Sequence, residues 1–270
     1  MFMELKTKFL LLFLIIISLG VLSLTLTLTN NKINGNYQVI LKNEAGISYS
    51  PKDRTEYISE FLATSCDVVI SRDKNSVANI YCLDDDCSDE IKSAISYLDI
   101  RGGGTICIRN GDYPIASEND IKFNNAKYIA IIGFGNVRFY ATKRGITLFA
   151  IGPSDETKTV KYVIKNIFFD MNNLARVVLL LINGENSIIE DIIIANRLGN
   201  PNYWMFSIWC RRAEILQTKD SLCKNNVIRN VIIENSTTTS WEAFTLTYTE
   251  NTIVENLYCK NVTFYCAIDY

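Results

Sequence analysis

The chain has 270 residues, of which 48% are hydrophobic and 21% are charged, a composition that excludes an intrinsically disordered protein. Its 27 basic and 29 acidic residues nearly balance, so no excess positive charge indicates nucleic-acid binding, and we expect no nucleic-acid partner. The chain contains no His, which removes the commonest general base, the commonest zinc ligand and every Ser-His or Cys-His nucleophile. Any chemistry must therefore use carboxylates, Lys, Arg, Tyr or Cys.

Residues 9–29 form an uncharged, mostly apolar segment that is long enough to span a bilayer as a helix. Lys6 and Lys8 precede it and only Lys32 follows closely, which predicts a short cytoplasmic segment at 1–8 and export of the rest. The alternative is a cleaved signal peptide and a secreted protein. Residues 24–27 lack the small residues of a cleavage site, so we favour an uncleaved, single-pass membrane anchor.

An even number of cysteines in an exported protein is compatible with disulfide bonds, although partly buried free thiols are an alternative. The eight cysteines fall into an early and a late cluster: Cys66, Cys82, Cys87 and Cys107, then Cys210, Cys223, Cys259 and Cys266. No pair has the C-x-x-C spacing of a zinc site, so we expect no metal there. Sequons at Asn235 and Asn261 are candidate glycosylation sites.

Residues 30–80 predict little regular structure, apart from a short helix near 55–62 and a strand at 68–70, and we assign them to a stalk or linker. A helix is then predicted to begin at Ser88 as its N-cap, with Asp89 and Glu90 in the first turn. One apolar stripe runs along this helix through Ile91, Ala94, Ile95 and Leu98. The glycines at 102–104 are expected to end it.

Short strands are predicted at 105–108 and 113–115, separated by a turn at Asn110–Gly111. If Ile106 and Ile108 point into the core, then Cys107 points outward, because side chains alternate along a strand. An outward Cys107 could form a disulfide with Cys82 or Cys87.

One five-residue sequence motif, which we call the repeated phrase, occurs four times in the second half of the chain, at residues 163–167, 188–192, 227–231 and 253–257. Its Asn or Asp position recurs after 25, 39 and 26 residues. A strand-sized phrase at a long period predicts stacked turns that bury their apolar faces against each other.

Two positions of the phrase carry polar side chains that would stack between turns. The first holds Asn166, Asp191, Asn230 and Asn256, and we expect a ladder of side-chain hydrogen bonds in which Asp191 is a structural member and not an acid. The preceding position holds Lys165, Glu190, Arg229 and Glu255, which alternate in sign. We expect a solvated row of charges that favours the correct register.

The segment IKSAISYLDIRGGGTICIRNGDYPI, followed by AKYIAIIG at 126–133, resembles the opening of pectate-lyase-like right-handed parallel β-helix proteins. In that superfamily, which includes sugar-degrading enzymes and phage tailspikes, a capping helix leads through a glycine-rich turn into the first rung. The resemblance covers roughly residues 85–270 and implies an all-β fold. We therefore expect a right-handed parallel β-helix solenoid at 81–270, with an N-terminal capping α-helix and a preceding transmembrane helix.

The interval of 39 residues is 13 or 14 longer than its neighbours, which predicts an insertion within 195–225. Insertions of this kind are typically surface loops that carry function. The candidate ligand-binding residues are Tyr203, Trp204, Trp209, Arg211, Arg212 and, one turn later, Trp241. Aromatic faces stack on sugars and guanidinium groups bind carboxylates, so an acidic glycan is the favoured ligand. The alternative is that Trp204 and Trp209 pack the insertion onto the coil.

The resemblance also brings two classes of enzyme into consideration. The polygalacturonase-type hydrolases use Asp residues together with a His motif, and this chain has no His. Calcium-dependent lyases use clustered acidic ligands and an Arg or Lys base, and only this alternative implies Ca²⁺. Weak catalytic candidates are Asp170, Glu190 and Asp191, with Arg197 or Arg211 as the base. The acidic run at 84–86 is expected to be a solvated helix start.

We therefore expect a membrane-anchored, exported β-helix protein that acts in surface recognition, with carbohydrate as the favoured ligand. The alternatives are a lyase acting on acidic polysaccharides and a purely structural envelope or spike component. The expected partners are the membrane, through the N-terminal helix, and a polysaccharide or glycan. A homo-oligomer is a further expectation, because no capping segment follows the last repeat and an open rung exposes unpaired backbone groups.

Overall fold

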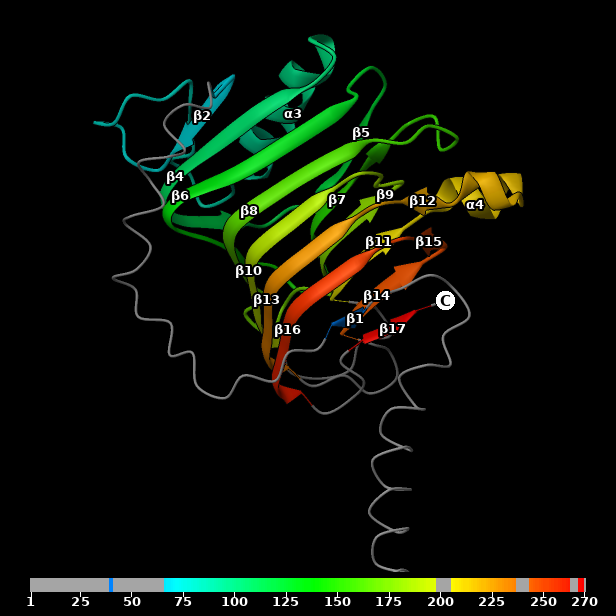
Figure 1. Ribbon diagram of the computed structural model, residues 1–270. Helices are drawn as coiled ribbons and strands as arrows, with labels where there is room; N and C mark the ends of the chain where they lie inside the picture. The colour runs from blue at the N-terminus through cyan, green and yellow to red at the C-terminus, as the bar shows by residue number, and fades with distance from the viewer. Residues whose placement is uncertain (1–38, 41–65, 198–204, 237–242, 263–266, 270) are drawn as a thin grey trace, which may run out of the picture. The chain divides into compact units, whose positions relative to one another are not determined.

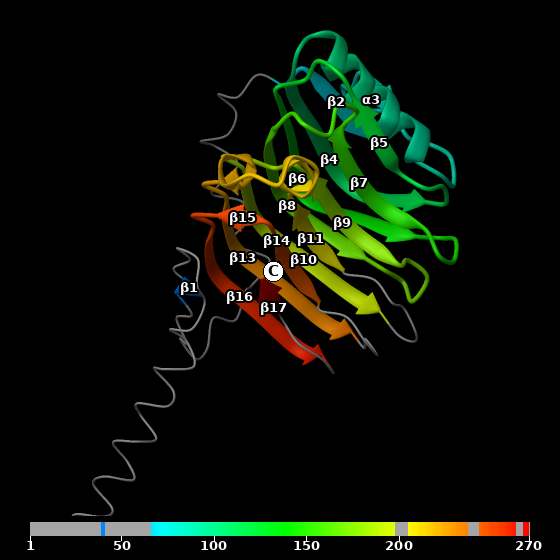
Figure 2. The same cartoon turned by 90° about the vertical axis from the view of Figure 1, so that its right-hand side faces the viewer.

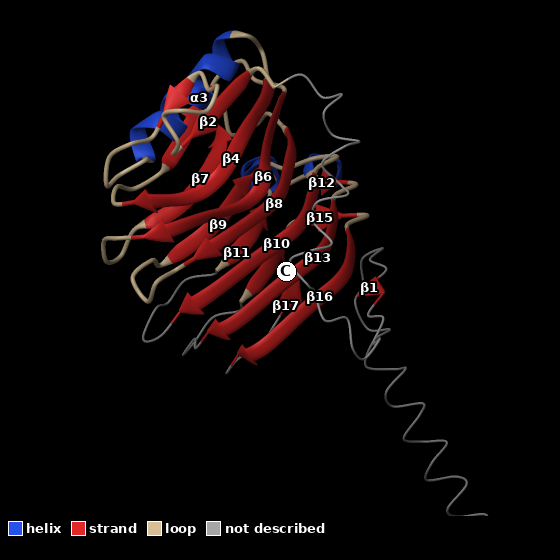
Figure 3. Cartoon of the chain, turned by 90° about the vertical axis from the view of Figure 1, so that its left-hand side faces the viewer, coloured by secondary structure: helices blue, strands red, loops and turns tan. Residues whose placement is uncertain are grey.

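The computed structural model describes residues 39–40, 66–197, 205–236, 243–262 and 267–269. The predicted cytoplasmic segment, the predicted membrane anchor at 9–29 and most of the predicted stalk lie outside these ranges. Within them, none of the helices has the length and apolar character needed to cross a membrane. The described chain is mostly β-structure in parallel sheets, with few helices (Figure 3).

Two large parallel sheets contain most of the strands. The first sheet has the order β1 (Val39–Ile40), β16 (Ile253–Val262), β13 (Val227–Ser236), β10 (Ile188–Arg197), β8 (Lys161–Asp170), β6 (Tyr128–Ala141), β4 (Gly104–Ile115), β2 (Val68–Ser71) and β3 (Ile80–Tyr81) (Figure 1). The second has the order β17 (Ala267–Asp269), β14 (Phe244–Thr247), β11 (Phe206–Trp209), β9 (Val177–Ile182), β7 (Thr147–Pro153) and β5 (Asp120–Phe123) (Figure 2). A short parallel pair joins β12 (Cys223–Lys224) to β15 (Thr249–Glu250).

The chain passes from one large sheet to the other at nearly every strand, so each strand pairs with a strand from the neighbouring turn. The apolar faces of the two sheets meet in one core. Phe139 of the first sheet contacts Phe149 of the second with ring centroids 5.0 Å apart, and Phe149 contacts Phe169 at 5.5 Å. The hydrophobic effect across this shared core therefore holds successive turns together.

The predicted capping helix is present as α3 (Ser88–Ile100), and its predicted apolar stripe is buried. The prediction that Ser88 is the N-cap is wrong, because Cys87 occupies that position without a side-chain cap. The carboxylate of Asp86 instead accepts hydrogen bonds from the Ser88 backbone N–H (3.0 Å) and the Ala116 N–H (2.9 Å). Burial alone would raise the pKa of Asp86, but these and two hydroxyl hydrogen bonds outweigh it and lower the pKa. Asp86 thus ties the helix start to the end of β4.

Two details of the first strands differ from the sequence prediction. The predicted turn at Asn110–Gly111 is a register irregularity inside one continuous strand, β4. The predicted strand at 68–70 is β2, and it pairs in parallel with β4. The sheet therefore includes strands that precede residue 81, where the β-domain was expected to begin.

The four repeated phrases lie side by side in register on β8, β10, β13 and β16. Their Asn or Asp positions all have left-handed backbone conformations, with φ of 56°, 56°, 55° and 52° for Asn166, Asp191, Asn230 and Asn256. Asn and Asp tolerate this conformation better than other residues with a Cβ. The predicted ladder is confirmed for three of its four members. Asn230 Nδ2 donates to Asp191 Oδ1 and Asn256 Nδ2 donates to Asn230 Oδ1, both at 2.9 Å.

Similar asparagines flank this column on both sides. The same left-handed conformation occurs at Asn186, Asn225 and Asn251 and at Asn196, Asn235 and Asn261. The repeats on β10, β13 and β16 therefore share the spacing Asn-x4-Asx-x4-Asn. This spacing is not among the predictions of the sequence analysis. Asn261 Nδ2 donates to Asn235 Oδ1 at 3.0 Å, and Asn225 Nδ2 donates to Asn186 Oδ1 at 3.2 Å. The bends of successive turns are therefore linked by amide side chains at three levels.

The predicted row of alternating charges is present, but it is less solvated than expected. Glu190 lies between two cations, 2.8 Å from Lys165 Nζ and 2.6 Å from Arg229 Nε. The side chains of Lys165 and Glu190 are only 16% and 14% exposed. Burial would raise the pKa of Glu190, but hydrogen bonds from Arg229 and Lys165 outweigh it and lower the pKa.

Three disulfides are described, and they correct one predicted pairing. Cys107 is not part of the apolar core cluster, although it is buried. Its partner is Cys66 and not Cys82 or Cys87, with the two Cα atoms 5.7 Å apart. The other two pairs are Cys82–Cys87 and Cys210–Cys223. Cys259 is also disulfide-bonded, whereas Cys266 lies outside the described residues. The alternative of free thiols is wrong for the described cysteines.

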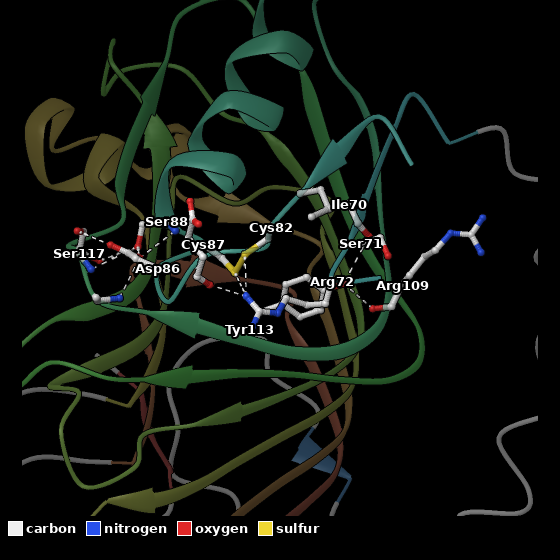
Figure 4. Close-up of a disulfide and its surroundings, with 12 residues drawn as sticks. Ile70, Ser71, Arg72, Cys82, Asp86, Cys87, Ser88, Arg109, Tyr113 and Ser117 are labelled. Carbon is white, nitrogen blue, oxygen red and sulfur yellow. Dashed lines mark hydrogen bonds between the residues drawn. A yellow bond between two sulfur atoms is a disulfide. The ribbon is translucent and has the colours of Figure 1, made fainter. Parts of the chain in front are cut away.

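The Cys82–Cys87 disulfide lies under the start of α3 beside Arg72 (Figure 4). Arg72 Nη1 is 3.6 Å from the Cys82 sulfur and donates to the Asp84 carbonyl at 2.5 Å. Arg72, which directly follows β2, therefore holds the turn at residues 84–86 beside β2, and the Cys87 N–H links it to β4 by donating to the Pro114 carbonyl at 2.7 Å.

The Asn ladder makes Asp191 the one charged member of its column, and this generates a prediction. Burial and the neighbouring charge of Glu190 raise the pKa of Asp191, although the Asn230 hydrogen bond partly offsets them. A folded-state pKa above the unfolded value means that ionised Asp191 costs stability at neutral pH. That cost disappears as the pH falls below the unfolded value of about 4.

We expect Asp191→Asn to raise the free energy of unfolding by about 0.5–1.5 kcal/mol at pH 7, because a neutral amide can accept from Asn230 and also donate along the column. The gain should shrink toward zero in acid. Urea unfolding at several pH values measures it, with Asn230→Asp as the opposite control that places two carboxylates in contact. A destabilised Asp191→Asn protein at pH 7 would contradict the assignment.

Candidate functional site

The long interval between repeats contains a disulfide-closed excursion from the stacked parallel strands. Trp209 and Cys223 are 14 residues apart in sequence, whereas their neighbours on the next turn, Thr247 and Thr249, are two apart. The excursion therefore contains 12 of the 13 residues by which the 39-residue interval exceeds the following one of 26. It comprises α4 (Arg211–Leu216) and the 3-10 helix η2 (Lys219–Ser221) (Figure 1).

The base of the excursion is fixed to the next turn of the coil. The Cys210 N–H donates to the Thr247 carbonyl at 3.0 Å, and the Cys223 N–H donates to the Tyr248 carbonyl at 3.3 Å. Both cysteines are fully buried, and their Cα atoms are 5.6 Å apart. Their predicted roles as disulfide partners are confirmed. A closed loop of this kind loses much of its conformational freedom, which keeps α4 in place.

The structure describes only some of the aromatic residues in and near the insertion. Phe206 belongs to strand β11 and contacts Phe244 in the core, with tilted rings whose centroids are 4.9 Å apart. Trp209 is partly exposed at the end of β11, and Tyr248 is 42% exposed with a left-handed φ of 55°. The remaining aromatic candidates lie outside the described residues: Tyr203, Trp204 and Trp241.

Arg211 joins the excursion to the body of the coil. Its guanidinium lies over the Trp209 ring, 5.0 Å from the centroid. Arg211 Nη1 is 2.7 Å from Glu214, and its Nε is 3.2 Å from Glu156. Hydrogen bonds from Arg211 to Glu214 and then Glu156 raise its pKa. A guanidinium stabilised in this way cannot serve as the base of a lyase, and its contact with Trp209 makes a rigid aromatic and cationic surface.

Arg212 lines a hollow of about 560 Å³ between α4 and the turns that follow β5 and β7. The lining residues are Asn124, Asn125, Ala126, Lys127, Pro153, Thr157, Lys158, Thr159, Val160 and Arg212. This set, which we call the cationic groove, contains three basic residues and no Asp or Glu. Its volume lies in the range of ligand-binding clefts.

Asn183 positions Arg212 at the groove. It follows β9 with a left-handed φ of 56°, and its side chain is completely buried. Its Nδ2 donates to the Glu156 carbonyl at 2.7 Å, and its Oδ1 accepts from the Arg212 N–H at 2.8 Å. One buried amide therefore connects the turn that carries Lys158 to the first turn of α4.

Four of the five weak catalytic candidates lie on strands β8 and β10 of the first sheet, outside the set of residues that line this groove, and the fifth is Arg211 of α4. Asp170 is buried, with Oδ2 2.5 Å from Arg138 Nη2 and Oδ1 accepting from Asn196 Nδ2 at 3.0 Å. Glu190 and Asp191 belong to the charge row and the Asn ladder. Arg197 is buried, and desolvation lowers its pKa to about 10. The structure does not bring these residues together into one open site.

In the part of the chain that the structure describes, no three or more Cys, Asp and Glu side chains are grouped so that they could hold a metal ion.

The sequon asparagines Asn235 and Asn261 are exposed at the end of their strands, within the outer asparagine column. Their partner threonines, Thr237 and Thr263, lie outside the described ranges, so glycosylation stays a prediction.

No protein-family model matches this sequence, and comparison with curated proteins and with solved structures also gave no match.

The bridging role of Asn183 generates a prediction. Replacement by Gly keeps the left-handed backbone available but leaves the Glu156 carbonyl and the Arg212 N–H without their partner. We expect Asn183→Gly to increase the rate of trypsin cleavage after Arg211 and Arg212 by roughly tenfold, because local opening of α4 becomes easier. The products are separated under reducing conditions, since the disulfide would otherwise hold the fragments together.

The matched control is Asn225→Gly, which removes an exposed left-handed Asn with one side-chain hydrogen bond to Asn186. It should leave cleavage at Arg211 and Arg212 nearly unchanged. Equal cleavage rates in wild type and Asn183→Gly would show that Asn183 does not position α4.

Proposed function

We propose that this chain is an exported surface-recognition protein whose ligand is an acidic carbohydrate, presented on a right-handed parallel β-helix of the pectate-lyase-like class. Strands that alternate between two parallel sheets, with in-register repeats and left-handed bends, support the β-helix. The glycine-rich turn after α3 and the pattern of the first rungs support the superfamily resemblance.

Export is supported by the cysteines. Three disulfides within the described residues fit an oxidising compartment, where such bonds persist. The apolar segment at 9–29 would then anchor the chain with the β-structure outside the cell membrane, or would be cleaved to release a secreted protein.

The observation that carries the recognition proposal is the Arg211 guanidinium lying over the partly exposed Trp209 ring at the base of the disulfide-closed excursion. The exposed Tyr248 follows β14, the strand that pairs with β11. Aromatic faces provide flat apolar surfaces for sugar rings, and guanidinium groups favour acidic ones. A recognition surface benefits from such rigidity, because little conformational entropy is lost when the ligand binds. The alternative role of Trp209, packing the excursion onto the coil, is compatible with its partial burial and is separated by the experiment below.

The lyase alternative is less well supported. It requires an unengaged basic side chain close to several carboxylates in an open groove. Asp170 and Glu190 each face cations that already neutralise them, and Arg211 is held by two glutamates. The groove beside α4 has no carboxylate among its lining residues.

The test uses the full chain in detergent micelles or nanodiscs, applied to immobilised polygalacturonate and to an immobilised neutral glucan. We expect retention on polygalacturonate, and about a fivefold to tenfold weaker affinity for Trp209→Ala because a stacking face is lost. The matched control is Tyr97→Ala, which removes an exposed aromatic ring from α3 without a change in retention.

Ultraviolet absorbance of unsaturated products, followed with and without Ca²⁺, distinguishes the alternatives. Product formation would support the lyase and overturn the binding proposal. No retention on either glycan would leave the structural role. A Trp209→Ala protein that binds normally but melts at a lower temperature would show that Trp209 serves packing.

A further inference from the structure

We infer that the cationic groove is an oxyanion-binding site that takes the sulfate or phosphate ester of a charged glycan. The inference rests on the proposed function for the identity of the larger ligand, but the anion site is separate from the Trp209 surface. Its residues come from three segments that are distant in sequence: Lys127 before β6, Lys158 before β8, and Arg212 in α4.

The charged residues that line the groove are all basic, and the carboxylates of Asp99, Asp155 and Glu156 lie next to the lining segments. The nearest glutamate in the β7–β8 turn, Glu156, is bound by Lys122 (3.6 Å) and Arg211 (3.2 Å), so its charge is neutralised by cations outside the lining set. Lys158 lies 3.4 Å from Asp155, but both side chains are about half exposed or more, at 60% and 48%. An exposed ion pair of this kind contributes little, so Lys158 can exchange it for a ligand at small cost.

Each cation-bearing segment is held in place before any ligand arrives. The Asp99 carboxylate accepts the backbone N–H groups of Asn125 (2.6 Å) and Ala126 (2.8 Å), next to Lys127. Burial would raise the pKa of Asp99, but these hydrogen bonds outweigh it and lower the pKa, so it remains ionised and bound to the turn. Asn183 fixes Arg212 in the same way. Preorganised cations lose less entropy on binding, which favours a real site over a solvated patch of charge.

The donors of the groove suit a tetrahedral oxyanion better than a carboxylate. Lys127 and Lys158 carry compact charges with several donors each, whereas carboxylates are typically recognised by an Arg fork. The Arg212 Nε is buried and has no hydrogen-bond partner among the described residues, which is an energetic cost that a ligand oxygen could remove. The amides of Asn124 and Asn125 and the hydroxyls of Thr157 and Thr159 add neutral donors on the same lining. A sulfate or phosphate ester presents three such acceptor oxygens.

The experiment compares dextran sulfate, unmodified dextran and inorganic sulfate as ligands of the full chain in nanodiscs, by isothermal titration calorimetry. We expect dextran sulfate to bind, dextran to bind much more weakly, and inorganic sulfate to compete with dextran sulfate. The double variant Lys127→Gln/Lys158→Gln should weaken dextran sulfate binding about tenfold. The matched control, Lys74→Gln/Lys143→Gln, removes the same charge from exposed lysines outside the lining set and should retain binding.

Equal losses of dextran sulfate affinity in the two double variants would show that the ligand is attracted by the overall charge of the protein. This result would overturn the proposal of an anion site. Unchanged binding in Lys127→Gln/Lys158→Gln, together with a loss in Trp209→Ala, would refute the anion site but leave glycan recognition standing. If Lys127→Gln/Lys158→Gln loses affinity for dextran sulfate while Trp209→Ala binds every glycan as wild type does, the anion site would be supported and the proposed recognition surface would be refuted. Thermal melting of each variant confirms that the fold is intact.

Discussion

The left-handed asparagine is the feature on which the rest of this structure depends. Among the residues that the structure describes, 15 residues other than glycine have positive φ and 12 of them are Asn, which lie within or next to the strands. Because few other side chains tolerate this conformation, an Asn at each bend lets the strand turn while its amide bonds to the equivalent amide of the next turn. The same residue type therefore sets both the shape of each turn and its register against its neighbours.

The candidate site also depends on an Asn in the left-handed conformation. Asn183 is a left-handed Asn, but its side chain connects the turn after β7 to α4 instead of another bend. The excursion is closed by Cys210–Cys223 and joined to the coil by Arg211 and Glu156. Rigid attachment at several points explains how an insertion can present side chains in a fixed arrangement, which a recognition surface requires.

The sequence was informative where contacts repeat and uninformative where they do not. The Asn ladder and the excursion could be predicted because in-register turns repeat one phrase and one interval departs from it. The Cys66–Cys107 pairing could not, because alternation gives only the direction of Cys107, and its partner depends on β2 lying beside β4. The groove was missed for a similar reason, since Lys127 and Lys158 lie in turns without a repeating pattern.

A double-mutant cycle on Asn230 and Asn256 tests the central claim most directly. Glycine at each position keeps the left-handed bend, so the coupling free energy of the pair isolates the side-chain hydrogen bond observed at 2.9 Å. Stacked amides that hold the register predict a coupling of about 0.5–1.5 kcal/mol in urea unfolding. Strictly additive losses would show that the asparagines act only through their backbone conformation and would contradict the account.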